Sequence, residues 1–129
     1  MTHSELRLVA ETTKFHINNV EMFGYLEQAR RPWYAHCLSI GVEGVIVHVE
    51  ADFKKEIFNQ EKLLITTWLE HVGNSSFTLK QKVINEQEEL IVTGKTVLAT
   101  INSETRTKVP VPNEFRALLD KDVVLSAKN

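Results

Sequence analysis

The stretch FHINNVEMFGYLEQARRPWYAHC, residues 15–37, joins a polar corner to a run with helical period. Apolar residues recur through it at spacings of four, three, four and four, at Met22, Leu26, Ala29, Trp33 and Cys37. That period predicts one long amphipathic helix with a single apolar stripe. Cys37 continues the stripe and is therefore expected in the core and not in thiol chemistry.

The polar corner FHINN lies between this helix and a strand pattern over residues 6–12. Asn18 or Asn19 can cap the helix, and Glu21 suits the positive end of its macrodipole. Pro32 interrupts the stripe, and its missing N–H predicts a kink or the start of a second helical segment. The corner residues therefore either cap the helix or belong to the catalytic residues of an active site.

Four strand patterns follow the helix, over residues 45–53, 62–72, 77–83 and 89–101, and a helical turn is expected near 113–119. The turns between the strands are short, which favours antiparallel neighbours. An antiparallel sheet with one covered face needs a helix to cover it. We therefore predict a single α+β domain over residues 1–129, in which a curved antiparallel sheet of about five strands wraps around one long central helix.

Composition excludes several classes of protein. The net charge of −2 gives no electrostatic basis for binding nucleic acid, and the apolar runs are too short to span a membrane. One cysteine rules out an internal disulfide and fits a reducing, cytoplasmic compartment. The five histidines show no close ligand pairing, so no metal site is expected.

Two segments, HINNV at 16–20 and YLEQAR at 25–30, together resemble the "GHVNN…Y…fEeAR" signature of hot-dog-fold acyl-CoA thioesterases, relatives of hydroxybenzoyl-CoA thioesterase. The likeness continues in register through four later segments, at 53–63, 72–76, 90–106 and 111–116. The resemblance covers about nine-tenths of the chain. It implies the hot-dog fold, and hydrolysis of an acyl-CoA to a free acid and coenzyme A, with no cofactor beyond the CoA carried by the substrate.

The resemblance also implies a site. In this family the first turn of the central helix lies against the thioester carbonyl, and its free N–H groups stabilise an oxyanion. That amide aligns with Asn19. The family's catalytic Asp aligns with Thr12, whose hydroxyl can orient water but cannot serve unaided as base or nucleophile. Phe15 stands where the family has Gly.

For each of the other candidate residues in the corner and the helix, both a catalytic and a structural role are possible. His16 could orient or activate water, or could simply hydrogen-bond at the corner. Asn18 and Asn19 could be caps. Glu27 lies near the catalytic pocket in the family, but its spacing from Arg30 also suits an ion pair on the helix surface.

Coenzyme A phosphates need cations, and Lys54, Lys55, Arg106 and Lys108 are the candidates, each of which could equally be part of a solvated rim. Apolar residues on both faces of the strands, with unpaired sheet edges, predict a homodimer or homotetramer with the active site between subunits. Two functions remain open: an acyl-CoA thioesterase with an altered site, and a hot-dog binding or structural module that has lost hydrolysis with the Asp.

Overall fold

The computed structural model describes residues 1–126. In chain order the elements are β1 (His3–Val9), α1 (Asn19–Ser39), β2 (Glu43–Phe53), β3 (Lys62–Val72), β4 (Ser76–Asn85), β5 (Leu90–Ile101), α2 (Asn113–Arg116) and a 3-10 turn (Ala117–Asp120). The predicted order of strand, long helix and four strands is confirmed. None of the helices within residues 1–126 is long and apolar enough to cross a membrane.

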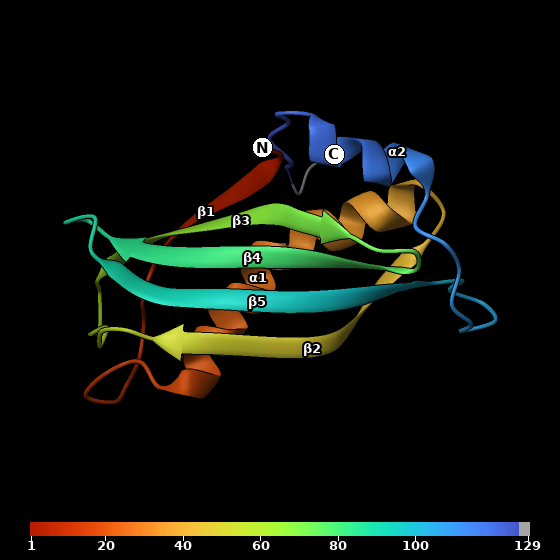
Figure 1. Cartoon of the computed structure of the whole chain (residues 1–129). Helices are drawn as coiled ribbons and strands as arrows, with labels where there is room; N and C mark the ends of the chain where they lie inside the picture. The colour runs from red at the N-terminus through yellow and green to blue at the C-terminus, as the bar shows by residue number, and fades with distance from the viewer. Residues whose placement is uncertain (127–129) are drawn as a thin grey trace.

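The five strands form one sheet in the order β1-β3-β4-β5-β2, with every neighbouring pair antiparallel. The long helix α1 crosses one face of this curved sheet obliquely (Figure 1). The opposite face is the one turned toward the viewer in Figure 1. Because consecutive strands β3, β4 and β5 are joined by short turns, the chain builds the middle of the sheet without crossovers.

Helix α1 buries the predicted stripe: Met22, Leu26, Ala29, Trp33 and Cys37 are all at most 3% exposed. They pack into two core clusters, one under each half of the helix. Pro32 does not divide α1, which runs unbroken for 21 residues, so the expected alternative of a second helical segment beginning at this proline is wrong. Buried residues on both sides of the proline hold the backbone helical despite the lost hydrogen bond.

Three further expectations change. The first strand ends at Val9 and not at residue 12: Ala10 still pairs with Gln60 and Glu61, but the Thr12 N–H bonds to the side chain of Asn59 and not to a backbone carbonyl. A register shift between Ile46 and His48 breaks the alternation in β2 and leaves Val47 59% exposed. The expectation of one long helix alone is also wrong. The helix α2 and the 3-10 turn add a second helical segment near the C-terminal end, with Phe115 buried beneath it.

The two edges of the sheet differ. At the β1 edge, residues 123–125 run parallel to the start of the strand, and His3 exchanges backbone hydrogen bonds with Val123 and Leu125. At the other edge, β2 pairs only with β5, and its free side carries exposed Ile46 and Val47. Within residues 1–126, β2 is therefore the longer uncovered edge.

Candidate active site

Two loops meet beside the start of α1: residues 10–18, which lead into the helix, and residues 54–61, which link β2 to β3. The Ile17 N–H donates to the Ile57 carbonyl over 2.8 Å, and His16 bridges Phe58 in antiparallel fashion. The Thr12 N–H donates to Oδ1 of Asn59 over 2.9 Å. These bonds fix the corner FHINN against a segment about forty residues away in sequence.

A cleft of about 380 Å³ opens where the two loops, the first turn of α1 and β5 converge. Its floor is apolar and buried, formed by Met22, Ile57, Ile91 and Val92, each at most 2% exposed. Its mouth is polar, with His16, Asn18, Asn19, Lys54, Lys55 and Glu56. An apolar floor under a polar mouth suits a ligand with one apolar end and one polar end.

Asn19, in the first turn of α1, lines this cleft and, within residues 1–126, has a free backbone donor. Asn18 is the N-cap, and its side chain accepts from the Glu21 N–H over 2.9 Å, while the Glu21 carboxylate accepts from the Asn18 N–H over 3.0 Å. This capping box satisfies the Glu21 N–H but leaves the N–H of Asn19 without an acceptor among residues 1–126. Asn19 lines the cleft, so an unpaired donor lies at the positive end of the helix macrodipole.

His16 is half-buried and lines the same cleft. Its Nδ1 lies 3.0 Å from the carbonyl oxygen of Ile17. A carbonyl can only accept, so Nδ1 is the donor of this bond, and in the neutral form of the ring Nε2 is then an acceptor. No group within residues 1–126 bonds to Nε2, which leaves it available to a water molecule or substrate.

Thr12 lies outside the cleft lining. Its hydroxyl donates to Oε1 of Glu21 over 3.3 Å and accepts from the Lys14 N–H over 3.1 Å. The Asn18 N–H is the main cause that lowers the pKa of Glu21 below its ordinary value, and the Thr12 hydroxyl contributes to the same shift. Thr12 therefore supports the capping box.

Glu27 is tied into a different set of contacts. It accepts from Arg30 Nη2 over 3.0 Å and from the Tyr34 hydroxyl over 2.9 Å. Arg30 is 3% exposed and also donates to Gln81 and Thr96 of the sheet. Glu27 stands eight residues beyond Asn19, about 12 Å along a helix axis, so the chain does not bring it to the cleft.

The four candidate cations divide into two pairs. Lys54 and Lys55 lie at the mouth of the cleft, where Lys55 is paired with Glu89 and the Lys54 ammonium has no partner within residues 1–126. Arg106 instead donates two hydrogen bonds, of 2.8 and 3.2 Å, to the carboxylate of Glu43 at the start of β2.

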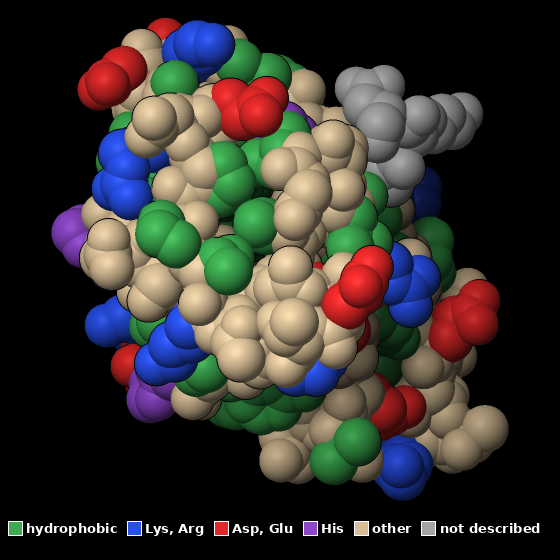
Figure 2. Space-filling model, turned by 90° about the vertical axis from the view of Figure 1, so that its right-hand side faces the viewer, with side chains coloured by type: hydrophobic (Ala, Val, Ile, Leu, Met, Phe, Trp, Pro, Cys, Tyr) green, Lys and Arg blue, Asp and Glu red, His purple; other side chains and the backbone are tan. Residues whose placement is uncertain are grey.

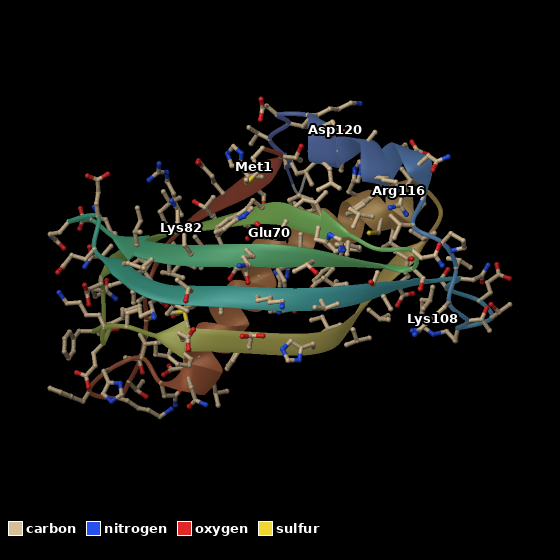
Figure 3. The ribbon with its side chains drawn as sticks, viewed as in Figure 1. Met1, Glu70, Lys82, Lys108, Arg116 and Asp120 are labelled. Carbon is tan, nitrogen blue, oxygen red and sulfur yellow. The ribbon has the colours of Figure 1, made fainter. Side chains whose placement is uncertain are left out.

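The cleft lies at the other end of β2, roughly 30 Å away along an 11-residue strand. Lys108 lies at the same end of the sheet as Arg106, away from the cleft (Figure 3). Figure 2 looks onto this end of the molecule, where cationic and anionic side chains are interspersed. Arg106 and Lys108 of the chain therefore do not lie near Lys54 and Lys55.

Glu56 and most of the cleft floor are not predicted by the sequence. Ile57, Ile91 and Val92 belong to strand or connector patterns, and nothing in their local pattern shows that they border a cavity. Glu56 lies in the polar connector KKEIFNQEK, which gives no signal of function. Only the pairing of the two loops places it beside His16 and Asn19.

Comparison with known families identifies one match. The model of the thioesterase-like superfamily matches residues 13–119, a span that includes the corner, α1 and the cleft. No curated protein matches the chain by sequence.

Solved structures similar to the chain include three from bacteria. A DHNA-CoA thioesterase from Staphylococcus aureus has 25% identity and a TM-score of 0.78, with 98% of this chain and 100% of that chain covered. A protein from Bacillus stearothermophilus described as a predicted thioesterase has 19% identity and a TM-score of 0.83, with 96% and 98% covered. A hypothetical protein from Staphylococcus aureus, in complex with CoA, has 12% identity and a TM-score of 0.79, with 90% and 80% covered. The resemblance to hot-dog thioesterases is confirmed.

Proposed function

Because the chain belongs to the thioesterase-like superfamily, we propose that it hydrolyses an acyl-CoA thioester to a free acid and coenzyme A. The proposal rests on Asn19, which lines a cleft with an apolar floor and whose backbone N–H has no acceptor among residues 1–126. A donor fixed at a helix N-terminus stabilises negative charge that develops on a carbonyl oxygen.

The proposed reaction uses water and the chain's own groups, with no cofactor beyond the CoA of the substrate. The acyl group lies on the floor formed by Met22, Ile57, Ile91 and Val92, and its carbonyl oxygen accepts from the Asn19 N–H. Water adds to the carbonyl carbon, the C–O double bond becomes an oxyanion, and collapse of the intermediate breaks the C–S bond. CoA leaves as the thiol once it has gained a proton. Nε2 of His16 accepts one hydrogen of the attacking water and orients it.

The coenzyme A part of the substrate extends from the mouth of the cleft, where Lys54 is free to meet a phosphate. Two similar structures support CoA as the carrier: one is named a DHNA-CoA thioesterase, and another contains CoA. Arg106 and Lys108 can contribute only if another subunit brings them to this cleft.

The alternative is a binding or structural module without hydrolysis, favoured by Thr12 in place of the family's Asp. A steady-state assay over a panel of acyl-CoAs, with free thiol detected, separates the two. The proposed function predicts turnover of at least one acyl-CoA well above the rate without protein. Saturable CoA binding with no thiol release from any member of the panel would favour the binding module.

The assembly we expect is a homodimer or homotetramer, with the cleft near the contact between subunits. The free edge of β2, with its exposed Ile46 and Val47, is the surface available for pairing with another copy. Light scattering at micromolar concentration should give at least twice the chain's mass of 14.8 kDa. A monomeric mass would contradict this assembly.

A further inference from the structure

We infer that Glu56 is the general base of the proposed hydrolysis, in the role that Thr12 does not fill. This inference rests on the proposed function. The two loops are joined by a bridge in which His16 faces Phe58 and the Ile17 N–H donates to the Ile57 carbonyl. Continuing that register one step places Glu56 opposite Asn18, the residue that caps α1.

Burial shows which way these side chains point. Ile17 and Ile57 are 8% and 2% exposed and lie in the core. Their neighbours in an extended pair turn the opposite way, and His16 and Glu56 are correspondingly half-buried and exposed. Across an antiparallel bridge they are diagonal neighbours, about 7–8 Å apart at the backbone. That separation leaves room for one water molecule between an imidazole nitrogen and a carboxylate.

The other carboxylates near the cleft are already engaged. Glu21 is bound by the Asn18 N–H and the Thr12 hydroxyl. Glu61 accepts from the Phe58 N–H over 2.7 Å, and Glu89 is bound by Lys55 and Asn85. Glu56 lines the cleft and has no side-chain partner among residues 1–126. It is thus the free carboxylate on the cleft wall.

The chemical step then balances within the site. One hydrogen of the attacking water is held by Nε2 of His16, and the Glu56 carboxylate takes the other as the water oxygen bonds to the thioester carbon. The C=O electron pair moves onto oxygen, facing the Asn19 N–H. When the intermediate collapses, the C–S bond breaks, and Glu56 returns its proton to the departing sulfur. No oxidant, reductant or metal takes part.

The experiment compares Glu56→Gln, Glu56→Asp and Glu56→Ala with the native protein on the best acyl-CoA of the panel. Glu104→Gln is the matched control, because Glu104 is exposed in the loop after β5, at the far end of the sheet. Loss of a general base lowers kcat by about 10²-fold or more. We expect that loss in Glu56→Gln with little change in KM, partial activity in Glu56→Asp, and recovery of Glu56→Ala by added formate. Circular dichroism verifies folding.

Two results overturn the assignment while leaving the proposed function standing: a native rate in Glu56→Gln, or a slow Glu56→Ala that formate does not rescue. A native protein that hydrolyses no acyl-CoA would instead remove the proposed function itself. The native rate therefore separates failure of the inference from failure of the function.

Discussion

The hydroxyl of Thr12 donates a hydrogen bond to Oε1 of Glu21 over 3.3 Å, which links the loop before α1 to the capping box of the helix. The residue in the place of the family's catalytic Asp therefore supports the helix start on which the proposed oxyanion site depends.

Thr12→Asp should not accelerate hydrolysis. The new carboxylate would lie beside the Glu21 carboxylate, and like charges at that distance disfavour the native corner. We expect a lower melting temperature than that of the native protein and an unchanged or reduced kcat. Thermal unfolding and thiol release measured on the same preparations check both. A faster, equally stable Thr12→Asp protein would show that the loop can turn residue 12 toward the substrate.

The pKa of Glu21 makes the capping box pH-dependent. Because hydrogen bonds lower its pKa in the folded chain, the carboxylate stabilises the fold above the unfolded pKa, and that contribution is lost as pH falls through the folded pKa. The difference in free energy of unfolding between native protein and Glu21→Gln should be largest at neutral pH and shrink in acid. Urea unfolding at several pH values measures it. A difference that stays constant over this range would contradict the assignment of the shift to the capping box.

Lys54→Ala should raise KM for acyl-CoA while leaving kcat nearly unchanged. An exposed charge contact is worth at most about 1 kcal/mol, or about fivefold in KM, and the effect should fall as salt rises. The corresponding acyl-pantetheine lacks the nucleotide phosphates and should show no difference. Lys82→Ala is the control, because Lys82 follows the inward-facing Gln81 and lies on the sheet face away from α1 (Figure 3). Equal effects of Lys54→Ala on both substrates would exclude a phosphate contact.

Cys37 should not react in the native protein. Its thiol is 0% exposed, and burial raises its pKa to about 12. Because thiolate is the reactive form, a thiol reagent such as DTNB should titrate almost no cysteine in the folded chain and one per chain in guanidinium. Rapid native labelling would mean that the half of the core around Trp33 opens readily. If Cys37 does not react with the reagent, the free-thiol assay for hydrolysis detects only the CoA that is released.

Local patterns were sufficient to predict most of the fold. The apolar stripe of α1 and the four later strands produce strong periodic signals, and Asn18 followed by Glu21 carries its own capping chemistry. Pro32 does not begin a second helical segment, because the burial of residues on both sides of it stabilises the helix by more than the local cost of the proline. The C-terminal helical segment was expected only as a turn, since few residues take part in it.

Fewer features of the candidate site than of the fold could be predicted from the sequence. His16, Asn18 and Asn19 share one motif, so their proximity was foreseeable from the resemblance. Glu56 was not, because its position depends on pairing between two loops that have no periodic signal. For Arg106, the sequence suggested a role that the chain alone does not support. Its charge suggested phosphate binding, but the structure pairs it with Glu43 far from the cleft.

In the proposed reaction, the backbone N–H of Asn19 holds the oxyanion. Asn19→Pro removes that N–H at the first helical position, where proline is tolerated, and the extended Asn18, at φ −88° and ψ 174°, suits a residue before proline. Asn19→Val keeps the N–H with similar bulk and is the matched control. We predict that Asn19→Pro folds normally by circular dichroism but loses about 10²–10³ in kcat for acyl-CoA hydrolysis, whereas Asn19→Val stays near the native rate. A well-folded Asn19→Pro protein that releases CoA at the native rate would contradict an oxyanion contact at Asn19.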